Sequence, residues 1–489
     1  MSSTPPTPTQ WGLNRTVASA SLPLPYQQQA SMASLLSGTS TTSLLPLRRH
    51  SVYGYEDRLV LDFGALHVKV GLSGESKPRY HLPITVPSFD DPSINAGLYE
   101  PTLDHRLTAR RREALIDLFL SIYNKYILTD SKQRKVIICD KVLMPMPIKQ
   151  LITDVLFRGF QVPAIHYANA DLLALMCFGR GSGIVVDIGH LETTAVPVYD
   201  GRPLYQLVKM APLGGKALIE RFKMLIKNHA SVKTSDDIPP STATTTDPTI
   251  QLNQILDSQP EQFWHNLVAQ TILVAQTASR MDLVETAQRN PLGQYAIYDN
   301  PQSKDVSVRV PYNASTAILT IPGWVRERAT EVWFEGAGTV SSEDDSLVSL
   351  VLDMLVKCPL DIRTDLASGL VFTGGCAMVP GVMTRVETDL KSVGGDGAFL
   401  LISDGRTGGK RAAVHRFDEV RRLVRDRIKV LRSVFGANLL AWVGGSLSGS
   451  LKMGVKELVR EDYLSEGGEY LVPDWSQLED SDEVVASEE

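Results

Sequence analysis

The sequence predicts an α/β protein. Short apolar runs that are typical of buried strands alternate along the chain with stretches whose apolar side chains recur at helical spacing. The expected strands include residues 58–64, 68–74, 134–144, 183–189, 194–201, 369–375 and 438–445. The clearest helical stretches are residues 112–127 and 346–357. At 489 residues, with 43% apolar and 21% charged side chains, the chain should hold about three domain-sized units.

The composition argues against several classes of protein. The chain has no run of about 18 apolar residues, so we expect no membrane-spanning helix and no membrane insertion. Its four cysteines form no CxxC pair, which argues against a disulfide framework or a zinc knuckle and favours a reducing compartment. A formal charge of −6 gives no reason to expect nucleic acid as a partner.

Both ends of the chain are expected to be tails. Residues 1–55 carry three arginines and no acidic residue, and they are rich in Ser, Thr, Pro and Gln, which predicts a disordered tail. A transit peptide is the alternative interpretation of this segment. Residues 479–489 carry six acidic residues and no basic one, which predicts a solvated, disordered acidic tail.

Two internal stretches are expected to be loops or insertions. The first, at about 228–260, contains the low-complexity run 239–249. The second, at about 392–416, is rich in glycine and leads into a basic segment, 410–432, with nine Lys and Arg residues against three acidic ones. That segment is either a solvated helical face or a surface for an acidic protein partner.

A weak internal repeat carries the first chemical signal. Residues 59–74 and 184–201 each begin with an expected buried strand that ends in Asp-x-Gly, followed by a turn and a returning strand. Two such hairpins can face each other across a cleft, with turn N–H groups directed at phosphates and carboxylates directed at a metal-bound water. A single Asp-x-Gly is more often an ordinary turn.

A third element makes the pattern more specific. Residues 373–381 contain a Gly-Gly turn that follows the apolar strand 370–372 and opens a helical stretch. This arrangement allows close approach of the backbone to a nucleotide. Two Asp-Gly hairpins followed in order by this turn are much more specific than any one of them alone.

In this order, the motifs resemble those of the actin family, within the wider class of sugar kinases and heat-shock ATPase chaperones. The similar segments are the first phosphate hairpin (61–79), the second phosphate hairpin (183–201), the adenosine turn (373–381) and the start of the C-terminal helix (441–451). The resemblance implies an actin-like ATPase-domain fold with two similar lobes around a nucleotide cleft. The first lobe would comprise residues 56–178 and 440–478, and the second would comprise residues 179–439.

Three further segments, 211–218, 350–375 and 460–476, resemble the pointed-end actin-related proteins of dynactin. That resemblance implies a cytoplasmic, cytoskeletal subunit that caps the pointed end of the actin-like filament in this dynein activator. Its partners would be the filament subunits and the other pointed-end subunits, with dynein as an indirect partner in microtubule-based transport.

The resemblance also implies a set of nucleotide-binding residues. Asp62 and Asp187 would face the magnesium ion and the phosphates. The other implied residues are Gly64, Lys69 and Gly189 on the phosphate hairpins, and Gly214, Gly215, Gly374, Gly375 and Met378 around the ribose and base. Lys69 would act as a point charge on the β-phosphate side. The implied cofactor is ATP or ADP with Mg²⁺, although hairpins and helix starts also need glycines for structural reasons alone.

Departures from the actin pattern predict that hydrolysis is very slow. Ala65 replaces the serine of the first phosphate turn, and Leu66 replaces a glycine. The water-positioning glutamine and histidine of actin correspond to Ala170 and Thr194, and His190 replaces an aspartate. Without a group that orients and activates the attacking water, turnover should be very slow.

The adenine contacts depart as well, because Val268 and Ala269 stand where actin has a Lys-Glu pair. We therefore expect a non-enzyme, with a nucleotide held structurally or with an empty cleft. The enzyme alternative is an ATPase or sugar kinase with Asp187 or His190 as base, for which no further acidic constellation is evident. Another alternative is a nuclear actin-related subunit of a chromatin-remodelling complex, suggested by segment 410–432.

The chain is shorter than actin between Pro83 and the strand at 136–139. The shortened part corresponds to the small pointed-end subdomain, whose loop inserts into the next subunit of an actin filament. A subunit without this loop can add to the pointed end and cannot accept another subunit, so a head-to-tail contact stops after one step. A loop that is shortened without consequence is the alternative.

Overall fold

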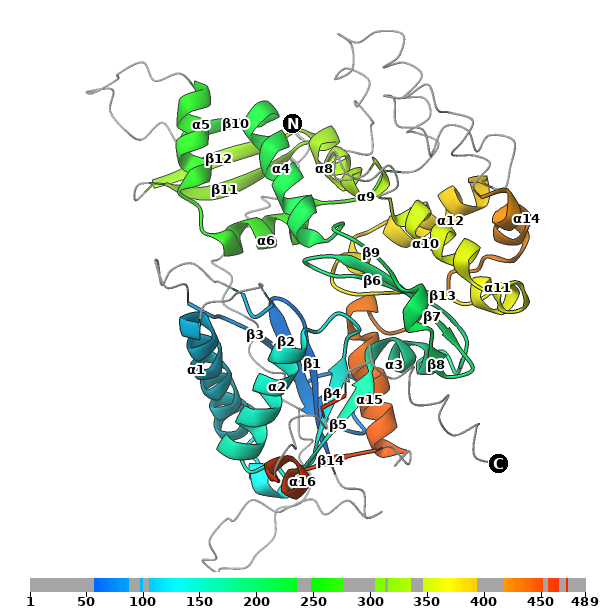
Figure 1. Cartoon of the computed structure of the whole chain (residues 1–489). Helices are drawn as coiled ribbons and strands as arrows, with labels where there is room; N and C mark the ends of the chain where they lie inside the picture. Colours follow the sequence, from blue (N-terminus) through cyan, green and yellow to red (C-terminus); the bar gives the residue numbers. More distant parts are fainter. Residues whose placement is uncertain are drawn as a thin grey trace, which may run out of the picture. The chain divides into compact units, whose positions relative to one another are not determined.

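Two larger β-sheets and one smaller sheet form the frame of the described part of the chain (Figure 1). The computed structural model describes residues 57–87, 97–99, 105–234, 248–275, 304–312, 315–335, 346–393, 417–451, 456–465 and 472–473. All of them belong to one unit, Tyr55–Glu489. The predicted tails and nearly all of residues 392–416 lie outside the described residues. The α/β class is confirmed, whereas the boundaries of the two lobes stay a prediction.

The six-stranded sheet has the order β14-β5-β4-β1-β2-β3. Its strands are β1 (Leu59–Phe63), β2 (His67–Leu72), β3 (Tyr80–Pro83), β4 (Val136–Asp140), β5 (Ala164–Asn169) and β14 (Leu458–Val459). β1 and β2 are antiparallel, which confirms the first predicted hairpin. β1 is parallel to β4, and β4 is parallel to β5, so these three strands end at the same edge of the sheet.

Two helices pack on one face of this sheet. They are α1 (His105–Ser121) and α2 (Met146–Asp154), and they continue as π-helical turns over Ile122–Tyr126 and Val155–Gly159. Their apolar side chains share a core with the sheet and with Tyr463 of the short helix α16 (Arg460–Leu464). The helix predicted at residues 112–127 is confirmed, because a continuous apolar stripe on α1 faces this core.

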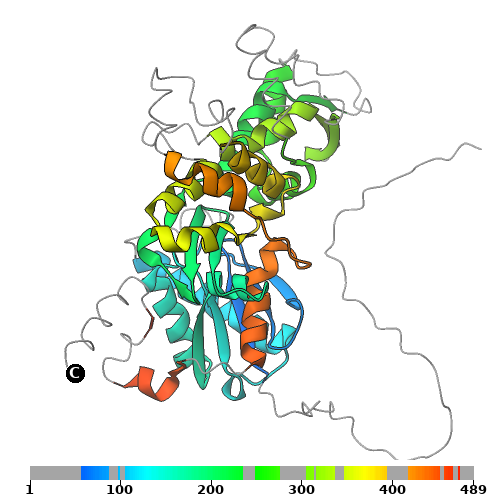
Figure 2. The same ribbon diagram turned by 90° about the vertical axis from the view of Figure 1, so that its right-hand side faces the viewer.

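The helix α15 (Leu440–Ser450), drawn in orange in Figure 1 and Figure 2, packs against β1, β4 and α3 (Ala170–Met176). The indole Nε1 of Trp442 donates a hydrogen bond to the Val60 carbonyl oxygen at 3.1 Å. The prediction of a strand at residues 438–445 is therefore wrong. Because α15 is buried on most sides, its sequence lacks the polar stripe that would have distinguished a helix from a buried strand.

The second large sheet has the order β13-β6-β7-β8, and β9 also pairs with β7. Its strands are β6 (Gly183–Ile188), β7 (Thr193–Tyr199), β8 (Arg202–Pro203), β9 (Lys209–Ala211) and β13 (Leu370–Thr373). The second predicted hairpin is β6–β7, and the strand of the third motif is β13. The helices in the same core are α10 (Leu347–Lys357), α11 (Leu360–Ala367), α12 (Val382–Val393) and α14 (Asp418–Arg427). The helix predicted at residues 346–357 is confirmed as α10, and a capping box at Ser346 starts it.

A three-stranded sheet, β10-β12-β11, completes this core. Its strands are β10 (Ser231–Thr234), β11 (Val306–Tyr312) and β12 (Ser315–Ile321), and the neighbouring helices are α4 (Gly215–His229), α5 (Pro248–Asp257), α6 (Glu261–Thr271), α8 (Gly323–Thr330) and α9 (Val332–Glu335). The expectation of a loop at 228–260 is wrong for β10 and α5. Ile255 and Leu256 of α5 are buried in the core, and this burial stabilises a helix next to the low-complexity run.

Residues 84–104 connect β3 to α1. Of this connection, residues 84–87 and 97–99 are described, and these contain neither a helix nor a regular strand. Leu98 is fully buried in the core of the six-stranded sheet. Leu98 therefore anchors the described part of this connection in the core that α1 also covers.

Two expectations concern the surface. Helix α14 buries Val420 and Val424 and leaves Arg422 and Arg425 exposed, as expected for the basic segment if it forms a solvated helical face. In the described ranges, no helix combines the length and the apolar character that crossing a membrane would require.

Candidate functional site

The charged residues of the site lie at the carboxyl ends of parallel strands, where ligands of open α/β sheets usually bind. In the six-stranded sheet, Asp62 of β1 is paired in register with Cys139 of β4. Lys141 directly follows β4, and Asp171 lies two residues beyond the end of β5. The strand register therefore brings these three side chains to one edge.

The other side of the site comes from the second large sheet. β6 and β13 are parallel, and Asp187 is paired in register with Thr373. Gly374 follows at once with φ +96°, and a Cβ atom there would overlap Asp187 Oδ1 and the Ile188 carbonyl oxygen. Only glycine fits this position, because both the backbone conformation and the space exclude a side chain.

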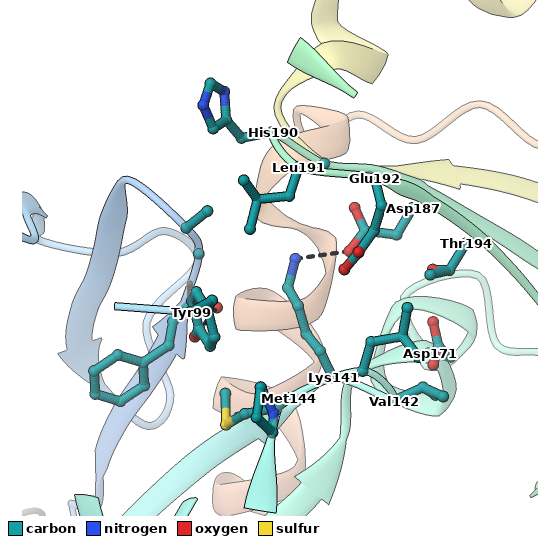
Figure 3. Close-up of a pocket in the computed structure, with 16 residues that line it drawn as sticks. Tyr99, Lys141, Val142, Met144, Asp171, Asp187, His190, Leu191, Glu192 and Thr194 are labelled. Carbon is teal, nitrogen blue, oxygen red and sulfur yellow. Dashed lines mark hydrogen bonds and ion pairs between the residues drawn. The ribbon is translucent and has the colours of Figure 1, made fainter. Parts of the chain in front are cut away.

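A cavity of about 190 Å³ lies between the two sheets (Figure 3). Its lining is Phe63, Gly64, Ala65, Tyr99, Lys141, Val142, Leu143, Met144, Pro145, Asp171, Asp187, Gly189, His190, Leu191, Glu192 and Thr194. Ligand pockets for drug-sized molecules usually measure about 300 to 1,000 Å³. The enclosed space is therefore small for a whole nucleoside triphosphate.

Two ion pairs neutralise the two predicted metal-facing aspartates. Lys141 Nζ lies 2.7 Å from Asp187 Oδ2, and Lys69 Nζ lies 2.5 Å from Asp62 Oδ2. Burial opposes ionisation of Asp62, but Lys69 and Lys141 outweigh it and hold the pKa of this carboxyl below its usual value. Burial disfavours the Lys141 ammonium, but Asp187 and Asp62 outweigh it and raise the pKa of Lys141. Asp62 and Lys141 are therefore charged at neutral pH.

The turn glycines of the two hairpins hydrogen-bond within their own turns. The Gly64 amide donates to the His67 carbonyl oxygen, and the Gly189 amide donates to the Glu192 carbonyl oxygen, both at 2.9 Å. These two amides therefore close the turns in this structure. The two glycines are therefore explained by hairpin geometry, and they do not by themselves indicate phosphate binding.

The remaining predicted glycines gather around the second hairpin. The Gly215 amide donates to the Gly189 carbonyl oxygen at 3.0 Å, so the start of α4 rests on the β6–β7 turn. A Cβ atom at Gly214 would overlap the His190 backbone, whereas one at Gly375 would meet no atom within 4 Å. Met378 is half exposed. The structure thus brings the second hairpin, the start of α4 and the Gly-Gly turn together.

Four polar lining residues were missed from the sequence: Tyr99, Lys141, Asp171 and Glu192. The expectation that no further acidic residues gather near Asp187 is wrong, because Asp171 and Glu192 line the same cavity. Burial, and then the charge of Asp187, raises the pKa of Asp171 to about 7, and the same two causes raise the pKa of Glu192. The strand that precedes Asp171, β5, was not among the expected strands, so no recognised sequence signal pointed to this residue.

The two positions that correspond to the water-positioning residues of actin lie at this site. Thr194 lines the cavity from β7, and Ala170 is buried at the start of α3. His190 also lines the cavity, and its ring centroid lies 5.1 Å from that of His265. Burial, together with the charge of His265, lowers the pKa of His190 to about 4. His190 is therefore neutral at physiological pH and is not a charged acid there.

The pKa of Asp171 predicts a dependence of stability on pH. A carboxyl whose pKa is raised from 3.8 to about 7 stabilises the fold when protonated, and this contribution is lost as the pH rises through that range. Relative to the wild type, the free energy of unfolding of Asp171→Asn should therefore rise by about 2 to 3 kcal/mol when the pH is raised from about 5 to about 8. Denaturant unfolding at both pH values measures this difference. Asp257→Asn, at an exposed carboxylate, is the control, and an equal response in both variants would contradict the prediction.

The residues do not fit a magnesium ion in this arrangement. One oxygen of each aspartate is bonded to a lysine ammonium, so these two oxygens are not available as ligands for Mg²⁺, which proteins usually bind through one or two carboxylates. Within the described ranges, no group of three or more His, Cys, Asp or Glu side chains is placed to hold a metal ion. Among the described residues, Oδ1 of Asp62 and Oδ1 of Asp187 are buried and have no hydrogen-bond partner.

Comparisons with known proteins agree with this architecture. Residues 55–473 match the family described as Actin. Actin-related protein 10 of Dictyostelium discoideum is 23% identical over 463 residues, which cover 86% of this chain and 89% of that protein. Actin-like protein 7A is 21% identical over 353 residues in Rattus norvegicus and 22% identical over 354 residues in Mus musculus. These two alignments each cover 68% of this chain and 70% of the relative.

Proposed function

The chain belongs to the actin family, and from this premise we propose that it is a structural, non-hydrolysing subunit that caps the pointed end of dynactin's actin-like filament. Similarity to Actin-related protein 10 over most of both chains supports an actin-related protein of this kind. The observation that carries the capping role is the connection from β3 to α1 through residues 84–104 alone. A subunit with this short connection lacks the loop that would insert into a further subunit.

The proposed partners follow from the capping role. One face would contact the last subunit of the actin-like filament, and the rest of the surface would contact other pointed-end subunits of dynactin. The protein would act in the cytoplasm, associated with the cytoskeleton, and would reach dynein only through the assembled complex. A contact of this type is heterologous, and it ends the filament because only one of its two complementary faces is present.

Capping can be tested with the full-length chain and purified actin-like filaments of dynactin. Gold-labelled protein viewed by electron microscopy should appear at one end of each filament, with one copy per filament. Alone at high concentration, the protein should stay monomeric in analytical ultracentrifugation. Binding along the filament sides, failure to bind, or formation of homopolymers would each overturn the proposal.

We also propose that any bound ATP or ADP is held structurally. Ala170 and Thr194 replace the glutamine and histidine that position water in the actin pattern, and this supports the proposal, because phosphoryl transfer to water needs a positioned nucleophile. Incubation of the full-length chain with ATP should give phosphate release no faster than the buffer background. The Asp171→Asn variant should give the same trace.

One observation favours a second candidate function, an ATPase or kinase that uses the same cavity. Asp171 lines the same cavity as Asp187, and burial raises its pKa to about 7, close to the value that suits a general base at neutral pH. Steady phosphate release by the wild type that is lost in Asp171→Asn would support this enzyme and sink the non-hydrolysing assignment. Circular dichroism at the assay temperature must show that the variant is as fully folded as the wild type.

A further inference from the structure

Lys141 connects the two large sheets. It directly follows β4 of the six-stranded sheet, and its Nζ atom lies 2.7 Å from Oδ2 of Asp187 on β6 of the second sheet (Figure 3). The side chains of Lys141 and Asp187 are 31% and 15% exposed, so water screens this pair only in part. An ion pair of this kind holds together the two walls of the cavity.

Four carboxyl groups interact electrostatically with the Lys141 ammonium. Asp187 is bonded to it, Asp171 and Glu192 line the same cavity, and Asp62 interacts with it electrostatically. Lys69 neutralises Asp62 from within the first hairpin. Lys141 thus neutralises the carboxylates on the side of the second large sheet. In a metal-dependent cleft, a divalent cation neutralises such carboxylates.

We propose that Lys141 is a built-in counter-ion that closes the cleft in place of magnesium, so that the two walls are held together without a divalent cation. The proposal replaces the sequence-based expectation of Mg²⁺ between Asp62 and Asp187. It does not rest on the capping role, since it concerns the isolated chain.

Loss of Lys141 would leave the carboxylates that it neutralises without a counter-ion. If Lys141 becomes methionine, Asp187, Asp171 and Glu192 face one another without a cation. Like charges in a partly buried site repel, and a divalent cation that binds only the folded state then stabilises it by mass action. The variant should acquire a dependence on Mg²⁺ that the wild type lacks.

The test compares the full-length wild type with Lys141→Met and with a matched control, Lys135→Met. Lys135 also forms a part-exposed ion pair, 3.0 Å from Glu457 and 33% exposed, but this pair does not reach the second large sheet. Thermal midpoints are measured without nucleotide, in EDTA and in millimolar Mg²⁺. We expect the same midpoint in both buffers for the wild type and for Lys135→Met. For Lys141→Met we expect a midpoint in EDTA at least about 4 °C below that of the wild type, with recovery in Mg²⁺.

Two outcomes would overturn the proposal. One is a wild-type midpoint that rises in Mg²⁺ and falls in EDTA, which would support the magnesium expectation. The other is a Lys141→Met variant that matches the wild type in both buffers. If Lys141→Met does not fold, Lys141→Arg keeps the charge and should retain insensitivity to EDTA, whereas an EDTA-sensitive Lys141→Arg would contradict the proposal.

Discussion

Replacement of Asp389 by alanine should destabilise the protein by about 3 kcal/mol, because it leaves the buried Arg385 with only the longer ion pair to Glu331, at 3.4 Å. Asp389 Oδ2 accepts from Nε of Arg385 at 2.7 Å, and Arg385 is fully buried on α12. The guanidinium also stacks over the ring of Phe334 at 4.6 Å and donates to the Ala275 carbonyl oxygen at 2.7 Å. Arg385 thus cannot move to water without breaking this packing. Denaturant unfolding followed by circular dichroism measures the loss.

The same helix offers a control for this prediction. Lys391 forms an (i, i+4) ion pair with Glu387 at 2.7 Å, and its side chain is about half exposed. Lys391→Ala should therefore change the free energy of unfolding by no more than about 0.5 kcal/mol, as is usual for exposed helical pairs. Equal losses in the two variants would show that burial of Arg385 is not the cause.

Replacement of Gly444 by alanine should reduce the free energy of unfolding by about 2 to 3 kcal/mol, because α15 and α3 touch at this residue. A Cβ atom at Gly444 would overlap the backbone carbonyl group of Leu173, and a backbone atom cannot turn aside as a side chain can. The two helices must then separate and disturb the packing of Trp442 on Val60. In an exposed helix the same substitution would stabilise by about 1 kcal/mol, so the sign of the effect tests the packing.

Gly159→Ala serves as the matched control. Gly159 lies at the end of the π-helical turn after α2, and a Cβ atom there would meet no atom within 4 Å. Its free energy of unfolding should stay the same or rise by up to about 1 kcal/mol. A loss in Gly444→Ala no larger than in this control would contradict the close-packing argument. Thermal and denaturant unfolding of both variants provide the comparison.

The elements predicted best from the sequence are those with local determinants. The hairpins β1–β2 and β6–β7 have an apolar run followed by turn residues within a single short window, and helix α10 has its cap at Ser346. Helix α1 has apolar side chains at helical spacing. The wrong predictions, a strand at 438–445 and a loop at 228–260, concern segments whose structure depends on distant partners. Helix α15 is specified by the faces that it packs against, and α5 is specified by the core that buries one side of it.

The site shows the same division. Asp62 and Asp187 could be predicted because each ends a recognisable strand before a glycine turn. Lys141 and Asp171 carry no such mark, and they reach the site through the parallel register of β1, β4 and β5. Without the strand order, neither residue can be assigned to the cavity.

By itself, the sequence determined the α/β class, the two Asp-Gly hairpins and the family resemblance, because these depend on residues that are neighbours along the chain. Only the tertiary structure decided how the charges of the cleft are paired. The Lys141–Asp187 bond joins residues far apart in the sequence, and an ion pair depends on distance in space. The α/β class with which the prediction began is therefore confirmed, while the chemistry of the cleft follows from the meeting of two sheets.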